Sequence, residues 1–281
     1  LNFKEMYHTL ADSSYSRIFF FDNWQEKHFF WKHFLGGAFL AIAMTGLDQD
    51  MMQKNLSCKN IEDAKKNMFW FSIILVPVNL LFLSLGILLI LFANKNGINL
   101  PIDTDQIFPL IATGGYLGST LGLFFIVGIV AAAYSSADSA LTALTTSFSV
   151  DILNVQKLND EAKIKRIRKR VHVGYSLVLL FVILGFKALN NSAVIDTIFK
   201  VASYTYGPLL GLFSFGIISK RSLPNNILVT IITIVSPLFC YLITLKSAQW
   251  FGGYTFGYEL LILNGLLTFL GLLIISKKSN E

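Results

Sequence analysis

Long stretches without a charged residue constrain the fold of this chain more than any other feature. They occupy residues 67–94, 106–137, 201–219, 222–245 and 260–276. About 20 consecutive apolar residues cross a bilayer as an α-helix. Only 14% of the 281 residues are charged, against about 25% in a typical soluble domain. The sequence therefore predicts an all-α polytopic protein of the lipid bilayer. We expect about seven transmembrane helices, near 29–47, 68–93, 118–151, 171–186, 194–218, 227–245 and 258–275.

The distribution of Lys and Arg predicts the orientation of these helices. Basic residues concentrate in alternate loops, within 48–67, 153–170, 219–226 and 276–281, whereas the loops between them carry only Lys95, Lys187 and Lys246. Positive residues of short loops stay in the cytoplasm. We therefore expect a plasma (inner) membrane protein whose C-terminus is cytoplasmic and whose residues 1–28 lie outside, in the extracellular or periplasmic space. The basic run within 161–170 is expected to face anionic lipid headgroups. The net charge of +6 is therefore explained by basic loops and does not indicate a nucleic-acid partner, and we expect none.

The third predicted helix carries the most unusual chemistry. Its second half, AAAYSSADSALTALTTSFSVDI, holds Ser135, Ser136, Asp138 and Ser139. At about 100° per residue these side chains share one broad helix face. A carboxylate within a membrane span is costly, and such a residue is a functional-site hypothesis by default. Hydroxyls, carbonyls and a carboxylate are the ligands of a hard cation such as Na⁺. Alternatively, the small residues form a helix-packing seam whose hydroxyls bond across helices or to their own carbonyls.

Three segments together resemble the sodium:solute symporter family. The first is AAAYSSADSALTALTTSFSVDI, which resembles that family's sodium-site helix. The second, GLDQDMMQKNLSCKNIEDAKK, resembles the motif that follows its gating helix, and the third, YTYGPLLGLFSFGI, resembles its later Gly-Pro motif. They come in the family's order and cover about 30–220. The family has a LeuT-type inverted-repeat fold, with ions and substrate bound near the midplane between the repeats.

The resemblance implies a domain organisation. Residues 1–28 would be an external segment, 29–218 the five helices of the second repeat, and 219–281 two additional helices with a cytoplasmic tail. The chain begins at Leu1, without an initiator Met, and the first repeat would be missing. We therefore expect a C-terminal fragment that does not transport by itself, and we leave open whether the truncation is natural.

The resemblance also assigns residues to a sodium site. The carbonyl of Ala132 and the hydroxyls of Ser135 and Ser136 match the family's main sodium ligands. Asp138 and Ser139 match positions at which some members bind a second sodium, so one or two Na⁺ per cycle both remain open. Na⁺ is the only metal or cofactor implied.

Two further groups match positions near the solute path or its gate. Asp48 and Gln49 match the family's DQ motif, with a gate or hinge as one interpretation and capping of the next helix as the other. Met44 stands where sugar carriers place an aromatic gate, which argues against a sugar.

Lys200 matches a substrate-contacting position and would suit an anionic solute. Alternatively, it pairs with Asp196 or extends to the outer surface. Tyr204 is either a cavity aromatic or part of the core.

The function expected from these features is Na⁺-coupled symport of a small organic solute by alternating access. The alternative is a non-transporting membrane sensor or receptor module built on the same fold. An enzyme is not expected, since the four histidines show no nucleophile or metal spacing. The sequence indicates neither the solute nor the oligomeric state.

Overall fold

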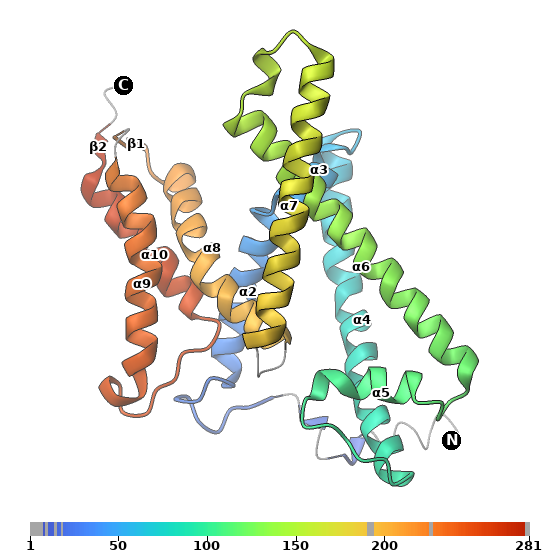
Figure 1. Ribbon diagram of the computed structural model, residues 1–281. Helices are drawn as coiled ribbons and strands as arrows, with labels where there is room; N and C mark the ends of the chain where they lie inside the picture. The colour runs from blue at the N-terminus through green and yellow to red at the C-terminus, as the bar shows by residue number, and fades with distance from the viewer. Residues whose placement is uncertain are drawn as a thin grey trace. The chain divides into compact units, whose positions relative to one another are not determined.

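The computed structural model describes residues 8, 11–13, 16–17, 19–189, 194–224 and 227–278. Within them the chain is almost entirely helical, which confirms the all-α prediction (Figure 1). The elements, in chain order, are α2 (Phe30–Gly46), α3 (Gln49–Leu56), α4 (Ile61–Lys95), η2 (Thr104–Gln106), α5 (Ile107–Thr113), α6 (Ser119–Ser147), η3 (Phe148–Ile152), η4 (Val155–Lys157), α7 (Glu161–Leu189), α8 (Val194–Ile218), β1 (Arg221–Ser222), α9 (Ile227–Trp250), α10 (Leu260–Ile275) and β2 (Lys277–Lys278).

Each predicted transmembrane segment coincides with a helix. Among the described residues, five helices are long and apolar enough to cross a membrane: α4, α6, α7, α8 and α9. A sixth is obtained if α2 and α3, which are separated by a short break, count as one broken span. The apolar helix α10 is shorter, with 16 residues. The chain is thus a polytopic α-helical membrane protein.

Two helices begin earlier than their apolar stretches. The sequence of 60–67 reads as a short surface helix and that of 161–170 as a solvated basic run, and in the structure 61–67 and 161–170 form the first turns of the long helices α4 and α7. The side chain of Asn60 caps α4 by accepting a hydrogen bond from the backbone N–H of Asp63 at 2.8 Å. No Gly or Pro interrupts either helix before its apolar part. Lys, Arg and Glu, which make up much of both segments, are good helix formers, so the helix continues through the polar segment without a break.

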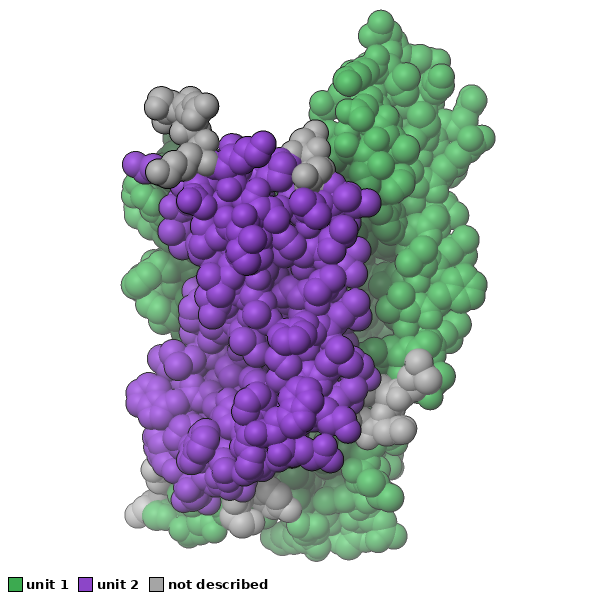
Figure 2. Space-filling view, turned by 90° about the vertical axis from the view of Figure 1, so that its left-hand side faces the viewer, with its two compact units in different colours: residues 1–16, 49–193 green, residues 17–48, 194–281 purple. Residues whose placement is uncertain are grey.

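The chain divides into two compact units, which Figure 2 shows in different colours. Unit 1 comprises residues 1–16 and 49–193, and unit 2 comprises 17–48 and 194–281. In unit 1, α6 packs against α3, α5 and α7, and α5 also packs against α4. The buried residues Leu89, Ala93, Ile107 and Ile111 form the core where α4 meets α5.

Unit 2 is built around the contact between α8 and α10, with α2 and α9 packed against the same pair. Leu40 and Ala43 of α2 meet Ala202 of α8 and Leu261 of α10 in its core. Small residues allow the close approach. A Cβ atom added at Gly211 would lie 2.6 Å from the backbone oxygen of Gly265, and one at Gly36 would lie 2.6 Å from the backbone nitrogen of Glu259. Close backbone approach through small residues is the usual basis of helix association in membranes.

Candidate functional site

The hydroxyl-rich face of α6 is uncovered. Ala132, Ser135, Ser136 and Asp138 are all exposed on a helix that is regular at these positions. Within the described part of the chain, Ser135, Ser136 and Asp138 make no side-chain hydrogen bond or ion pair, so their oxygens are not used to pack unit 1. The carbonyl of Ala132 keeps one lone pair beyond its helix bond. The donors present fit a hard cation.

Ser139 has a different environment from the other four residues. It is half-buried, and its hydroxyl donates a hydrogen bond of 2.6 Å to Oδ1 of Asp50. The other carboxylate oxygen of Asp50 accepts a hydrogen bond of 2.6 Å from Nζ of Lys54. Asp50 therefore joins α3 to α6. It is a residue that the sequence analysis missed, although it directly follows the predicted Asp48–Gln49 motif.

The residues of the DQ motif lie where the chain passes from one compact unit to the other. Asp48 is the last residue of the first segment of unit 2, and Gln49 is the first residue of both the second segment of unit 1 and α3. Asp48 is half-buried, and Gln49 is exposed. Met44, four residues earlier, packs against the core of Leu40, Ala43, Ala202 and Leu261. In the structure Met44 is thus a packing residue of unit 2.

Lys200 and Tyr204 line a cavity of about 130 Å³ within unit 2. Lys200 is exposed, and no ion pair with Asp196 is formed. Asp196 instead accepts a hydrogen bond of 3.0 Å from the hydroxyl of Tyr258 and lies 3.8 Å from Nζ of Lys27. The alternative of an Asp196–Lys200 pair is therefore wrong for this structure, because other groups occupy the carboxylate.

The hydroxyl of Tyr204 is the other notable group of this cavity. It is buried and has no partner of normal hydrogen-bond geometry among the described residues, and the side chain with which it interacts is that of Thr244. Thr244 lines the same cavity, but its hydroxyl donates at 2.8 Å to the carbonyl of Cys240. The Tyr204 ring lies edge-on to Tyr241, with centroids 6.0 Å apart. Tyr204 is thus both a packing residue and a residue that lines the cavity.

A phenol of the same cavity is held in its neutral form. Tyr258 lies in the loop before α10. Burial raises the pKa of Tyr258 to about 12, and the hydrogen bond and negative charge of Asp196 contribute in the same direction. At neutral pH the Tyr258 hydroxyl therefore remains a donor to Asp196, which satisfies part of that carboxylate.

Asn264 of α10 is a second polar residue that sequence reasoning missed. Pro208 has no N–H, so the carbonyl of Tyr204, four residues earlier, lacks its helix partner. The Asn264 amide donates to that carbonyl at 2.9 Å and to the carbonyl of Ser203 at 3.1 Å. The Ser236 hydroxyl donates at 2.7 Å to Oδ1 of Asn264. The sequence signal that could have identified Asn264 is a single polar residue within an apolar run, the same kind of signal that identified Asp138.

Lys32 explains how a charge is accommodated at the start of α2. The residue is 8% exposed. Its Nζ donates to the carbonyls of Gln25 and Thr255 at 3.1 and 3.0 Å, and lies 3.4 Å from the centre of the Tyr254 ring. These contacts and Glu259 at 4.0 Å surround the ammonium group. Lys32 thereby ties the loop before α10 to the segment before α2.

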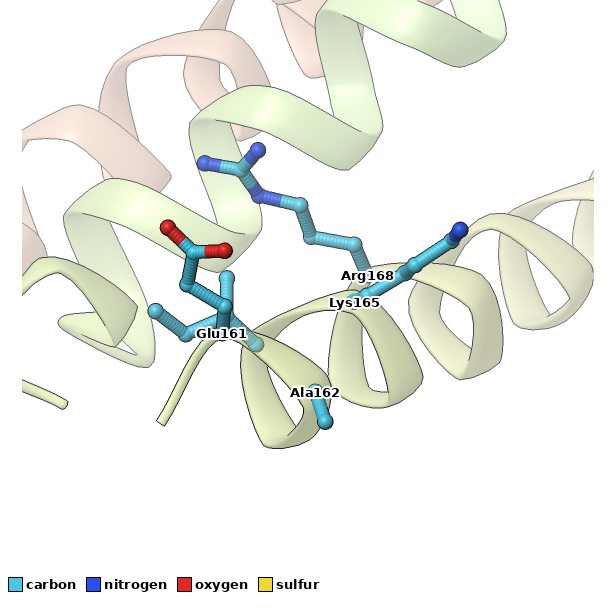
Figure 3. A pocket seen from close by; sticks show the side chains of 5 residues that line it. Glu161, Ala162, Lys165 and Arg168 are labelled. Carbon is cyan, nitrogen blue, oxygen red and sulfur yellow. The ribbon is translucent and has the colours of Figure 1, made fainter. Parts of the chain in front are cut away.

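The basic start of α7 forms an open groove rather than an enclosed site. Glu161, Ala162, Lys165 and Arg168 line it, all from one helix, and Figure 3 shows their side chains extending from the helix surface. A groove lined by a single helix offers no second wall to desolvate a ligand. These residues remain consistent with a solvated face near lipid headgroups.

Comparison with known proteins gives distant relatives that are sodium-coupled transporters. The chain is 24% identical over 210 residues to the sodium/sialic acid symporter NanT of Aliivibrio fischeri (strain ATCC 700601 / ES114), a match that covers 72% of this chain and 40% of that protein. It is 26% identical over 206 residues to the sodium/sialic acid symporter SiaT of Proteus mirabilis (strain HI4320), covering 70% of this chain and 40% of the relative. A Drosophila melanogaster protein named as a sodium-dependent multivitamin transporter is 24% identical over 206 residues, covering 68% of this chain and 33% of its own length.

These matches support the general class of protein, a sodium-coupled solute transporter, and not a particular solute. No family model matches the chain. The chain spans less than half the length of the curated relatives it matches. Their printed names share dependence on sodium and differ in solute. The fold class and these relatives together place the chain among proteins similar to sodium-coupled solute transporters.

Proposed function

We propose that this chain contributes to a Na⁺-coupled symporter of a small organic solute that works by alternating access. The observation that carries the proposal is the uncovered hydroxyl and carboxylate face of α6. Polar side chains are unfavourable in lipid, and three of them on this helix have no hydrogen-bond or ion-pair partner within the described residues. They are Ser135, Ser136 and Asp138. Such groups in a spanning helix indicate an ion path.

We assign Na⁺ to this face through the carbonyl of Ala132 and the hydroxyls of Ser135 and Ser136. Asp138 adds a negative charge one turn further along. Ser139 is a weaker ligand for a second ion, because its hydroxyl is directed to Asp50 at 2.6 Å. A membrane potential supplies about 2.3 kcal/mol per charge per 100 mV, so one or two Na⁺ could drive useful accumulation.

The proposed architecture is the second half of an inverted-repeat transporter, with residues 29–218 as the repeat and 219–281 as added helices. The position of Asp48 and Gln49 at the break between α2 and α3 supports their interpretation as a hinge. The orientation we propose has residues 1–28 outside and the C-terminus in the cytoplasm, as the distribution of basic residues favours.

Sodium-driven uptake tests this function. The complete reading frame that contains the chain is reconstituted in proteoliposomes, and uptake of a solute panel that includes N-acetylneuraminate is measured with and without an inward Na⁺ gradient. We expect one solute to accumulate only with Na⁺. We expect Ser136→Ala and Asp138→Asn to raise the Na⁺ concentration needed for half-maximal uptake by about tenfold, the loss of one charge-assisted ligand.

Ser72→Ala is the matched control for this experiment. Ser72 lies in the spanning helix α4, and among the described residues its hydroxyl bonds only to its own helix, donating to the carbonyl of Met68 at 2.9 Å. Uptake by that variant should match the wild type. An unchanged Na⁺ requirement in both α6 variants would make the face a packing seam and would refute the assignment.

A further inference from the structure

Exposed aromatic rings gather around the start of α2. The rings of Phe19 and Phe21 lie 5.4 and 4.9 Å from that of Phe30, measured between centroids. Phe30 also contacts Trp31 at 5.2 Å and Phe34 at 5.8 Å. From this juxtaposition we propose that these five residues, the aromatic collar, are seated in the headgroup interface of the lipid bilayer. The segment that precedes α2 is then held in the membrane surface and does not stand free in the external water.

Contact between the rings does not bury the collar. Four of its rings remain between 53% and 57% exposed, those of Phe19, Phe21, Trp31 and Phe34. Exposed apolar surface is unfavourable in water, and a contiguous patch of it marks a surface for association with a membrane or a protein. The collar therefore requires a partner that covers it.

Contacts within unit 2 hold the collar at the level where helices of the membrane end. The N–H of Phe30 donates at 2.8 Å to the carbonyl of Phe20, which folds the preceding segment back onto the start of α2. Gln25 joins this segment to the loop after α9. Its amide donates at 2.7 Å to the carbonyl of Gly252, and its carbonyl accepts at 2.9 Å from the N–H of Thr255. Because α9 is long and apolar enough to cross the membrane and ends just before this glycine, the segment lies at the membrane boundary.

Continuity with apolar helix surface favours lipid over a protein partner. Beyond the collar, α2 exposes Leu35 and Ile42. At about 100° per residue, Trp31, Leu35 and Ile42 share one face of the helix, so the apolar surface of the collar continues along α2. At the end of the spanning helix α9, Trp250 and Phe251 are exposed as well. Aromatic rings at the ends of apolar helices are typical of the membrane–water interface.

Charged groups beside the collar suit the headgroup layer and not the hydrocarbon core. Arg17 lies over the Phe20 ring, 4.7 Å from its centroid, and pairs with Asp22. Asp22, Glu26 and Lys27 are exposed. Charges are costly in the hydrocarbon core, whereas in the headgroup layer they stay hydrated while the neighbouring rings leave water.

Depth-dependent quenching of tryptophan fluorescence tests the proposal. The full chain, with its four native tryptophans replaced by Phe, carries Phe21→Trp as its single fluorophore in phosphatidylcholine nanodiscs. We expect lipid brominated near the top of its acyl chains to lower the emission at least about twofold, because an interfacial ring contacts that part of the lipid. Lipid brominated near the chain ends and water-soluble acrylamide should each quench it less.

Two further proteins keep the test decisive. Lys59→Trp in the same tryptophan-free chain is the matched control. It lies exposed in the polar loop between α3 and α4, and acrylamide should quench it more than either lipid does. A chain that keeps only the native Trp31 reports from another ring of the collar and should respond as Phe21→Trp does. It provides an independent test if Phe21→Trp does not fold.

Each other result at the collar positions would overturn the proposal. Quenching by acrylamide and not by lipid would place the collar in water. Strongest quenching by bromine near the chain ends would place it in the hydrocarbon core. Resistance to all three quenchers would show that protein, either a second copy or another segment, covers it. No Na⁺ or solute enters the measurement, so its outcome is independent of the proposed transport function.

Discussion

Individual polar residues in apolar helices show where this chain departs from simple packing. Asn264 is fully buried, and its amide replaces the helix hydrogen bond that Pro208 cannot make. Its side-chain oxygen accepts from Ser236. Every polar atom of that side chain thus has a partner. In contrast, Ser135, Ser136 and Asp138 find none among the described residues, and this difference separates a structural polar residue from a candidate ligand.

Replacing Asn264 by Leu tests its structural role. The change removes the amide that donates to the carbonyls of Ser203 and Tyr204, while the Ser236 hydroxyl keeps only its bond of 3.0 Å to the backbone carbonyl of residue 264. We expect a loss of about 1–3 kcal/mol in the free energy of unfolding, the cost of unsatisfied buried groups. Denaturant unfolding of the chain in detergent micelles measures it. Asn67→Leu, at an exposed position of α4, should change stability far less, and equal effects in the two variants would refute this role.

At the scale of the elements, the contact between α8 and α10 organises unit 2. A Cβ atom at Gly207 would lie 2.3 Å from the Asn264 side chain, and one at Gly211 would lie 2.6 Å from the backbone of Gly265 and from the Cβ of Thr268. The glycines are therefore required by the proximity of the two helices, not by a special backbone conformation. The loop contacts of Lys32 and the packing of α2 add to the same assembly.

Gly207→Ala tests whether this proximity is required. We expect it to lower the free energy of unfolding by about 1–3 kcal/mol, because an added methyl group forces the helices apart. Gly216→Ala is the matched control in the same helix, since nothing lies within 4 Å of its added Cβ. That variant should be neutral or slightly stabilising, as Ala favours a helix over Gly. Two variants that unfold alike in micelles would contradict the proposed packing.

The elements also show what the sequence could and could not predict. Uncharged stretches located the helices well, because length and apolarity alone determine which segments cross a bilayer. The continuity of α4 from Ile61 and of α7 from Glu161 into the apolar stretches was not predicted, since hydropathy detects the membrane boundary and not the end of the helix. The bond between Ser139 and Asp50 was missed because it joins residues 89 positions apart in sequence.

At the scale of the whole molecule, the sequence and the structure divide the chain by different criteria. The resemblance groups residues 29–218 by chain order, whereas the compact units join α2 with α8, α9 and α10. The compact units are defined by which helices pack together, whereas a repeat is defined by a symmetry between two sets of helices. The division into units therefore does not test the repeat assignment, which stays a prediction. The cavity around Lys200 could not be predicted, because it requires His33 of α2, Thr244 of α9 and Tyr258 of the loop before α10 to meet beside α8.

Direct binding of Na⁺ tests the central claim, which is that the exposed face of α6 holds the coupling ion. Radioactive ²²Na⁺ is titrated onto the purified protein in nanodiscs, with choline as the competing cation and Ser72→Ala as the control. We predict saturable binding that choline does not displace, an affinity at least about tenfold lower in Ser136→Ala, and no change in Ser72→Ala. Equal Na⁺ affinity in Ser136→Ala and the wild type would contradict the account.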